Sequence, residues 1–308
     1  MMLLCIRNLS VTFDTLRGPF RAIEGIDLDL YEGETLAIVG ESGCGKSVLG
    51  HAIMRLLDDI ATVDGSVKYK GQEVYSMEKS ELLNLRGKSI SLVPQSPSTS
   101  FNPVLKVGEQ IKEIIEKDRI DKGPAAKKRA IDFLAKAGFS DPLSIYNSYP
   151  HQLSGGMCER ALIAMAVSVE PELIIADEPT KGLDALSRKS LLAMLHEMAQ
   201  GASMIMITHD LKAAATCRRV TVMYSGEIVE EGRTSNLLNS PKHFYTQGLL
   251  EAQPSRAMLP IKGRHTLLSH NDIGCRFRER CDAADEMCKN HPVLRRRDVM
   301  EWVRCHHA

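Results

Sequence analysis

Near the start of the chain, hydrophobic and polar residues alternate. Val11 and Phe13 have polar neighbours on both sides, and Ile26, Leu28 and Leu30 alternate with aspartates. A period of two places one set of side chains on one face of a β-sheet. We therefore expect antiparallel strands at the beginning of the chain.

Between residues 107 and 139 the hydrophobic positions recur at helical steps, with charged residues on the remaining faces. The pattern occurs in two stretches separated by a Gly-Pro pair at positions 123 and 124; the residues that carry it are Ile111, Ile114, Ile115, Ala130, Ile131 and Leu134. A Gly-Pro pair commonly separates two elements. We expect a small helical subdomain at this point.

Residues 161–231 alternate between helical and strand patterns. Apolar runs at 173–176, 204–208 and 220–224 indicate strands, and 185–199 indicates a helix. This alternation is typical of a mainly parallel sheet covered on both faces. The fold class predicted is therefore α/β.

The length of 308 residues suggests about two domains. We predict a main α/β domain at 1–235, with the helical subdomain at about 96–158 inserted into it. Residues 236–265 contain several prolines and indicate a linker wrapped on the core. Residues 236–308 would form a C-terminal regulatory extension that contains four clustered cysteines.

Charge and hydropathy exclude some classes of protein. The 39 Lys and Arg residues balance 39 Asp and Glu residues, which gives no support to a nucleic-acid binder. The most apolar charge-free stretch, 161–169, is far shorter than the roughly 20 residues of a membrane-spanning helix. The first residues show no signal peptide. We expect a cytosolic protein, or one held to a membrane only by partners.

A glycine-rich motif carries the first chemical signal. It fits the pattern G-x-x-x-x-G-K-[ST] and consists of Gly40, Glu41, Ser42, Gly43, Cys44, Gly45, Lys46 and Ser47. A predicted strand precedes it and a predicted helix follows it, so backbone N–H groups and a helix N-terminus would face one phosphate. Lys46 would reach the β- and γ-phosphates of a nucleotide, and Ser47 would bind Mg²⁺.

Two further motifs fit the same chemistry. The strand at 173–176 ends in Asp177 and Glu178. Asp177 would hold Mg²⁺ through water and Glu178 would polarise the attacking water; the alternative is a capped strand end. Ser154, Gly155 and Gly156 open a helix and form a second anion-binding N-terminus. We interpret it as closing over the phosphate loop of a second subunit.

In this order, the motifs resemble those of the ATPase subunit of ABC transporters. The resemblance implies a P-loop nucleotide-binding domain with a RecA-like core, an antiparallel β subdomain and an inserted helical subdomain. It also implies roles for single residues. Gln95 would touch Mg²⁺ and the lytic water, His209 the γ-phosphate, and Asp184 the site of the other subunit. Phe13 would stack on adenine, with Phe20 as the alternative.

A narrower resemblance joins the chain to the oligopeptide, dipeptide and nickel importers. It rests on residues 149–157, 98–103 and 241–250. It implies an ATP-driven uptake motor on the cytoplasmic side of the cell membrane. The implied partners are a second ATPase subunit (a paralogue or the same chain), two transmembrane permeases and an extracytoplasmic substrate-binding protein, and no nucleic acid. Cys158-Glu159 and Lys181-Gly182 depart from the family pattern, which bears on rate and partner pairing.

The last part of the chain contains Cys275, Cys281, Cys288 and Cys305. Their spacing is too wide for a zinc ribbon, but four cysteines are a usual ligand set for a [4Fe–4S] cluster. The segment resembles the C-terminal cysteine motif of peptide-importer ATPases, which implies such a cluster. Zinc, and free thiols or a conditional disulfide, are the alternatives.

Cys44 lies inside the phosphate loop, and one interpretation is that it is a small neutral residue that fills space. It is also near a helix N-terminus, which lowers the pKa of a thiol. We expect a thiol reagent to inhibit the protein and bound ATP to protect it.

Two other functions remain as alternatives. One is a soluble ABC ATPase that acts on nucleic acid or ribosomes, which usually shows a basic surface, two cassettes or a long coiled coil. The other is a regulatory subunit that binds ATP without turnover. Glu178 argues against the second.

Overall fold

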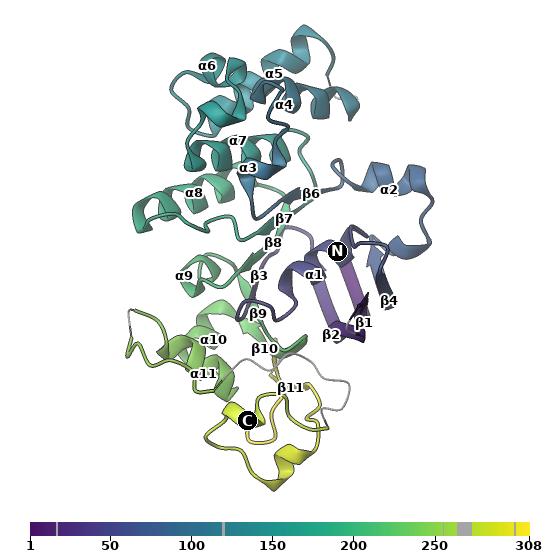
Figure 1. Cartoon of the computed structure of the whole chain (residues 1–308), viewed down its shortest axis with the longest axis vertical. Coiled ribbons are helices and arrows are strands. Elements are labelled where there is room, and N and C mark those ends of the chain that lie inside the picture. Colours follow the sequence, from purple (N-terminus) through teal and green to yellow (C-terminus); the bar gives the residue numbers. More distant parts are fainter. Residues whose placement is uncertain (17, 119–120, 255, 264–272, 299) are drawn as a thin grey trace. The chain divides into compact units, whose positions relative to one another are not determined.

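The computed structural model describes residues 1–16, 18–118, 121–254, 256–263, 273–298 and 300–308 (Figure 1). The chain forms two compact units. The first comprises Met1–Tyr31, Thr35–Ser76 and Ile207–Ala308, and the second Glu32–Glu34 and Met77–Met206. The domain boundaries expected from the sequence stay a prediction.

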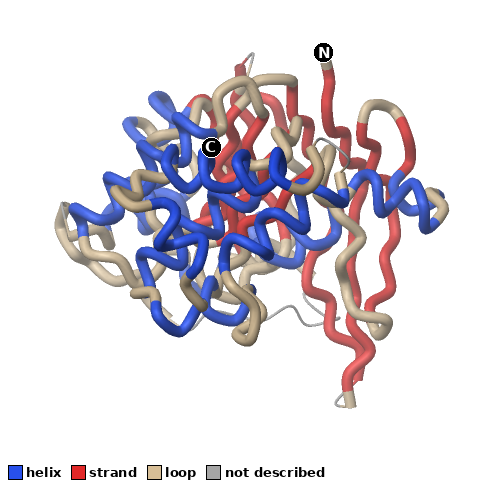
Figure 2. Tube along the Cα trace, turned by 90° about the horizontal axis from the view of Figure 1, so that it is seen from above, coloured by secondary structure: helices blue, strands red, loops and turns tan. Residues whose placement is uncertain are grey.

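The first unit begins with the antiparallel sheet that the alternating pattern predicts. Figure 2 shows β1 starting at the labelled N-terminus beside its partner strands. The strands are β1 (Met2–Thr15), β2 (Gly18–Tyr31), β4 (Ala61–Tyr69) and β5 (Gln72–Glu73), in the order β2-β1-β4-β5. Val11 pairs with Ile23 on one side and Val63 on the other. The prediction of antiparallel strands is confirmed.

A second set of strands in the first unit carries the phosphate loop. β3 (Thr35–Val39) pairs in parallel with β9 (Arg219–Tyr224), and β10 (Glu227–Arg233) pairs antiparallel with β9. β12 (Glu301–Val303) continues on β10, and β11 (Arg295–Asp298) pairs with β12. The sequence analysis did not predict this last hairpin, because its four-residue β11 is exposed and mostly arginine.

The helices of the first unit are short. They are α1 (Lys46–Ile53), η1 (Val74–Ser76), α9 (Leu211–Ala214), α10 (Thr234–Asn239), α11 (Phe244–Glu251), η3 (Arg278–Arg280) and η4 (Glu286–Lys289). Residues 236–265, expected to be a linker, thus contain most of α10 and all of α11.

The second unit contains the parallel strands β6 (Ile90–Val93) and β7 (Leu173–Asp177), and β8 (Ser203–Thr208) as far as Met206. Its helices are α2 (Lys79–Leu85), α3 (Pro97–Ser100), α4 (Val107–Lys117), α5 (Pro124–Lys136), α6 (Pro142–Asn147), η2 (Pro150–Gln152), α7 (Gly155–Val167) and α8 (Ala185–Met198). In Figure 1, α4, α5 and α6 gather beside α7.

The two predicted helices of residues 107–139 are present as α4 and α5. Ile111 and Ile115 of α4 are buried, as are Ala130 and Leu134 of α5, so the helical period did identify the packed faces. The two helices meet the buried ring of Tyr146. A side chain at Gly108 would lie 2.0 Å from that ring, which requires glycine at this position.

An aromatic cluster ties α11 and the following segment to β9. The rings of Tyr224 and Tyr245 lie 4.5 Å apart between centroids, and Phe277 lies 5.3 and 5.4 Å from them. His243 is buried against Phe277, and its Nδ1 accepts a hydrogen bond of 3.0 Å from the backbone N–H of Tyr245, which caps α11. Offset and edge-to-face contacts of this kind add to the burial of apolar area.

No helix among the described residues is long and apolar enough to cross a membrane.

Two glycines set the path of the loop between β3 and α1. A Cβ atom at Gly40 would lie 2.2 Å from the carbonyl oxygen of Met223. Gly45 has φ +102°, and a Cβ there would lie 2.7 Å from the carbonyl oxygen of Ala22. Both obstacles are backbone atoms, which cannot move aside as a flexible side chain can.

We predict that lowering the pH destabilises the first unit through His243. Burial lowers the pKa of this imidazole to about 4, and the nearby carboxylate of Glu227 opposes that shift only in part. In the unfolded chain the His243 imidazole has a pKa near 6.5, so between pH 6.5 and 4 the unfolded chain binds more protons than the folded one. The contribution of neutral His243 to folding stability is therefore complete above this window and is lost as the pH falls through it. His243→Asn keeps a capping acceptor and does not titrate. Denaturant unfolding should show that the free energy of unfolding falls by about 3 kcal/mol more in the wild type than in the variant across this window. The prediction fails if the free energy of unfolding changes with pH by the same amount in both proteins.

We also predict that Gly45→Ala destabilises the nucleotide-free protein far more than Gly43→Ala. Both glycines have positive φ, so both alanines carry a left-handed strain of roughly 1–2 kcal/mol. A side chain at Gly43 meets nothing within 4 Å, whereas one at Gly45 collides with backbone. Thermal denaturation should therefore separate the two variants by about 2 kcal/mol or more. Equal melting temperatures would show that the loop relaxes around Gly45.

Candidate functional site

The phosphate loop has the strand, loop and helix that the motif predicts. β3 leads into Gly40, and α1 begins at Lys46 with Gly45 as its N-cap residue. The first turn of α1 contains no acidic residue. Its unpaired N–H groups and positive dipole end are therefore suited to a phosphate, and Ser47 lies in this turn.

Lys46 folds back on its own loop. Its Nζ atom donates hydrogen bonds to the carbonyl oxygens of Gly40, at 2.9 Å, and Glu41, at 2.8 Å. The side chain is buried, so its ammonium group is held at the centre of the loop. This is where a cation can serve as a point charge for phosphate oxygens.

Cys44 does not have the reactive environment expected from the sequence. Its thiol is buried, and burial raises its pKa, while the ammonium of Lys46 opposes the shift only in part. A buried thiol of raised pKa holds little thiolate at neutral pH. The lowered pKa expected for Cys44 is therefore wrong, because burial outweighs the helix N-terminus. Inhibition by a thiol reagent and protection by ATP stay predictions.

Glu41 of the loop is held by an ion pair and a hydrogen bond from two residues that no sequence motif linked to it. The carboxylate pairs with Arg280, and the backbone N–H donates a 2.9 Å hydrogen bond to the hydroxyl of Tyr245. Both partners lie more than 200 positions away, so no local pattern pointed to them.

Phe13 and Phe20, the two candidates for stacking on adenine, face each other across the β1–β2 pair. Both are half-buried. Both candidates therefore lie at the same place in the sheet, and the stacking residue stays a prediction. His209, which follows β8, is exposed in the same unit.

In the second unit, Gln95 and Glu178 line one small cleft. Val93 of β6 pairs with Ala176 of β7, so both residues follow neighbouring parallel strands at the same edge. The cleft is lined by Val93, Pro94, Gln95, Glu159, Leu162, Ile163, Glu178 and Pro179. Strand ends of a parallel sheet are the usual place for ligands.

The backbone around the two carboxylates is specialised. Asp177 ends β7 and is buried, and Glu178 has φ +49°, which is the left-handed region. A glutamate held in this conformation carries strain, which is common at functional sites.

Glu159, which stands at a departure from the family pattern, also lines the cleft. Burial raises the pKa of its carboxyl group to about 7. Among the described residues, its buried Oε2 atom finds no hydrogen-bond partner. The sequence signalled this position as unusual but did not place it beside Gln95 and Glu178.

The serine-glycine motif begins α7. The Oγ atom of Ser154 accepts a hydrogen bond of 3.4 Å from the backbone N–H of Met157, so Ser154 is the N-cap. Ser154 and Gly155 are exposed, and a Cβ atom at Gly155 would meet nothing within 4 Å. This helix N-terminus is therefore open to a ligand or a second chain.

Asp184 caps α8 in the same unit. Its carboxylate accepts hydrogen bonds from the backbone N–H groups of Leu186, at 2.9 Å, and Ser187, at 3.1 Å. A hydrogen bond from the Ser187 hydroxyl lowers its pKa, so it is ionised at neutral pH. Asp184 is exposed.

The four C-terminal cysteines lie near one another. The pKa of Cys275 is raised to about 11, chiefly by burial and in part by the nearby sulfurs of Cys288 and Cys305. Cys281 experiences both of these thiols in the same way. All four are free thiols.

A second grouping in this segment was not expected. The ligand atoms of Asp285, Cys288 and His307 lie within 4.8 Å of one another among the described residues. The Cys288 Sγ atom is 3.7 Å from Nε2 of His307, and the backbone N–H of His307 donates to Sγ of Cys305 at 3.4 Å. His307 was not singled out in the sequence because it lies only two positions from Cys305, in a spacing with no motif.

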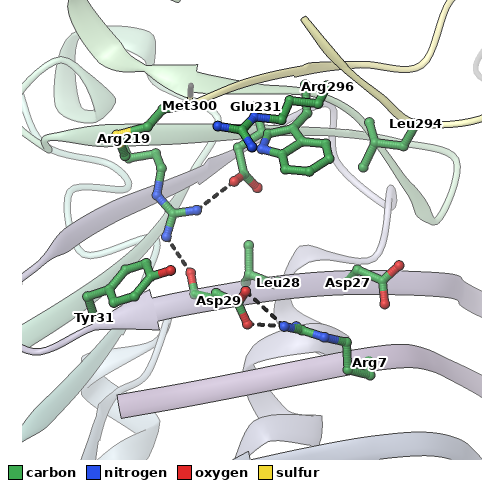
Figure 3. A pocket seen from close by; sticks show the side chains of 11 residues that line it. Arg7, Asp27, Leu28, Asp29, Tyr31, Arg219, Glu231, Leu294, Arg296 and Met300 are labelled. Carbon is green, nitrogen blue, oxygen red and sulfur yellow. Dashed lines mark hydrogen bonds and ion pairs between the residues drawn. The ribbon is translucent and has the colours of Figure 1, made fainter. Parts of the chain in front are cut away.

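A larger cavity of about 570 Å³ belongs to the first unit but contains no predicted nucleotide residue (Figure 3). In it, Arg7 forms a bidentate pair with Asp29, Arg219 pairs with Glu231 at 2.6 Å, and Trp302 is part of the lining. Arg219 also donates a hydrogen bond to the carbonyl oxygen of Asp29, so these charged groups join β9 to β2.

Comparison with known proteins agrees with this geometry. The family described as ABC transporter matches residues 23–181, and the family described as oligopeptide/dipeptide transporter, C-terminal region, matches residues 229–288. The chain is similar to the oligopeptide transport ATP-binding protein AppD of Bacillus subtilis (strain 168), with 38% identity over 98% of this chain and 96% of that protein. It is equally similar to the dipeptide transport ATP-binding protein DppD of Escherichia coli (strain K12), with 38% identity over 100% of this chain and 97% of that protein.

A solved structure gives the same result for the fold. The ATP-binding cassette MJ0796, in a dimeric post-hydrolysis state bound to ADP and Pi, matches with a TM-score of 0.69 and 27% identity, over 75% of this chain and 99% of that chain. The P-loop ABC ATPase fold predicted from the motifs is confirmed. From its identity to these relatives over nearly the whole length of both chains, the protein belongs to the ABC transporter family, among the ATP-binding subunits of oligopeptide and dipeptide importers.

Proposed function

We propose that this chain hydrolyses ATP to drive uptake of peptides across the cell membrane, with nickel as the alternative cargo. The observation that supports it most is the pairing of a phosphate loop with a C-terminal region that matches oligopeptide/dipeptide transporters. The names of the similar proteins AppD and DppD point to the same cargo class.

The proposed chemistry follows from the residue types. Lys46 would bind the β- and γ-phosphates, and Ser47 and Asp177 would hold Mg²⁺, with Gln95 as a further ligand. Glu178 would orient the attacking water, and His209 would contact the γ-phosphate. Phe13, or Phe20 opposite it, would stack on adenine. The buried position of Asp177 and the cleft shared by Gln95 and Glu178 support these roles.

A second ATPase subunit would complete each site. The open N-terminus of α7 at Ser154, Gly155 and Gly156 would bind the γ-phosphate held by the partner, and exposed Asp184 would reach the partner's loop. The partner is a paralogue or a second copy of this chain. A solved relative that is dimeric supports pairing.

The remaining partners are two transmembrane permeases and an extracytoplasmic substrate-binding protein. With them, the chain would lie peripherally on the cytoplasmic side of the membrane. The alternative function, an ATPase acting on nucleic acid or ribosomes, gains no support from the relatives described above. Balanced charge also argues against it.

We further propose that Cys275, Cys281, Cys288 and Cys305 hold an iron–sulfur cluster, with zinc as the alternative. The proposal is supported by four free thiols in one short segment, of which Cys275 and Cys281 are each close enough to Cys288 and Cys305 to interact electrostatically with them. The cysteine-bearing residues 273–308 bury few apolar side chains of their own, and a bound cluster would cross-link them. If the metal is zinc, Asp285, Cys288 and His307 are a competing ligand set.

We predict that Glu178→Gln abolishes ATP turnover and peptide uptake but leaves ATP binding intact. The amide keeps the shape of the side chain and loses the charge that orients water. Steady-state ATPase activity should fall by about 100-fold or more. Glu197→Gln, at an exposed position of α8, is the matched control and should change neither quantity.

The uptake assay uses cells that express the chain together with two permeases and a substrate-binding protein, and it compares radiolabelled dipeptide, a longer peptide and ⁶³Ni²⁺. Uptake of nickel alone would replace the peptide proposal. Uptake of none of them, with ATPase activity that depends on added duplex DNA or ribosomes, would favour the alternative function.

For the cluster, we predict roughly four irons and four sulfides per chain after anaerobic purification, with absorption near 400 nm. Cys281→Ser should lower the iron content, and Cys5→Ser, in β1 far from the other thiols in sequence, should not. One equivalent of zinc without sulfide would establish the alternative metal, and no metal under these conditions would contradict both.

A further inference from the structure

One arginine of the C-terminal segment reaches the phosphate loop. Arg280, the last residue of η3, contacts Glu41 through two hydrogen bonds: Nη1 to Oε2 at 2.7 Å and Nη2 to Oε1 at 3.0 Å. Only 4% of the arginine side chain is exposed. A bidentate arginine–carboxylate pair fixes direction as well as distance, so this contact sets the orientation of the Glu41 side chain.

The other surfaces of the guanidinium are also occupied. Nε donates a 2.8 Å hydrogen bond to the carbonyl of Lys262, and the group lies 5.7 Å from the ring centre of Tyr224 and 5.9 Å from that of Phe277. Cation–π contacts of this kind strengthen when they are shielded from water. Arg280 therefore has one well-defined position, set by residues outside the loop.

Glu41 is held at its backbone as well. Its N–H donates to the hydroxyl of Tyr245 at 2.9 Å, and its carbonyl accepts from Nζ of Lys46 at 2.8 Å. Side chain and backbone are thus fixed from α11 and the C-terminal segment on one side and from the loop lysine on the other. A displacement of Glu41 would move an acceptor of Lys46.

Charge adds a second consequence. Glu41 contributes a carboxylate to the loop that binds the negatively charged phosphates of ATP, and an uncompensated carboxylate would repel them. Arg280 neutralises it. Lys46 is engaged with carbonyl oxygens and does not pair with this carboxylate in the hydrogen bonds described.

We propose that Arg280 is a positioning residue of the nucleotide site: through its buried ion pair with Glu41 it orients and neutralises the phosphate loop, so the affinity for ATP depends on the C-terminal segment. This inference rests on the proposed ATPase function and adds a residue to its binding step.

The test measures ATP affinity of the purified full-length chain with Mg²⁺, and KM and kcat of the assembled transporter. Arg280→Ala should weaken ATP binding and raise KM by about tenfold, with kcat changed by about threefold or less. Arg280→Lys should have an intermediate effect, because lysine restores the charge without the bidentate geometry.

The double variant Glu41→Gln/Arg280→Ala separates charge from folding. Removing the carboxylate together with the arginine leaves no uncompensated charge, so the double variant should bind ATP at least threefold more tightly than Arg280→Ala. If Arg280 only held the segment together, Glu41→Gln would give no such recovery, and that result would overturn the proposal.

Arg276→Ala is the matched control. Arg276 is a similarly buried arginine of the same segment, but it binds Glu24, and the carbonyl of Ser225 at 2.7 Å, in place of the phosphate loop. It should lower the melting temperature and leave KM for ATP within about twofold. An equal rise of KM in Arg276→Ala and Arg280→Ala would overturn the inference. Failure of the wild-type chain to bind ATP would instead overturn the proposed function.

Discussion

The phosphate loop can follow its path only because glycine stands at two positions where the surrounding backbone leaves no room for a side chain. At Gly40 the backbone of Met223 in β9 occupies the space of a Cβ atom, and at Gly45 the carbonyl of Ala22 does so. The loop therefore lies directly against β9 at Gly40 and against β2 at Gly45. This close approach brings the carbonyls of Gly40 and Glu41 around the ammonium of Lys46. The geometry of the phosphate loop therefore depends first on these close contacts between backbone segments.

Charge pairing holds the C-terminal segment where apolar burial is scarce. Arg276 contacts Glu24, Arg280 contacts Glu41, and Arg304 contacts Glu227 at 3.6 Å. A small segment cannot bury enough apolar area for independent stability. Buried ion pairs contribute little net stability, but they penalise every arrangement that leaves a charge unpaired. They therefore select one docking geometry for the segment, and Phe277 adds the apolar anchor.

In the second unit, the candidate functional residues lie at the ends of regular elements. Gln95 and Glu178 follow two parallel strands, and Ser154 and Asp184 cap two helices. Strand ends and helix N-termini are rigid and carry unpaired backbone groups, which makes them suitable positions for binding anions and metals. The buried carboxyl of Glu159 adds a group that titrates near neutral pH to this region.

The sequence by itself determined the elements whose signal is local. Alternation identified β1 and β2, the helical period identified α4 and α5, and the glycine motif identified the loop and its lysine. Local signals suffice there because side-chain direction follows directly from backbone period. The family followed from the order of the motifs, which comparison with known proteins confirmed.

Only the tertiary structure decided the environment of each group. The sequence placed Cys44 near a helix N-terminus, but burial raises its pKa, since the desolvation that packing imposes is not a local property. The pair of Arg280 with Glu41 joins residues 239 positions apart, and the hairpin of β11 and β12 pairs with the distant strand β10. Contacts between distant segments arise from the packing of the whole unit, and no short pattern encodes them.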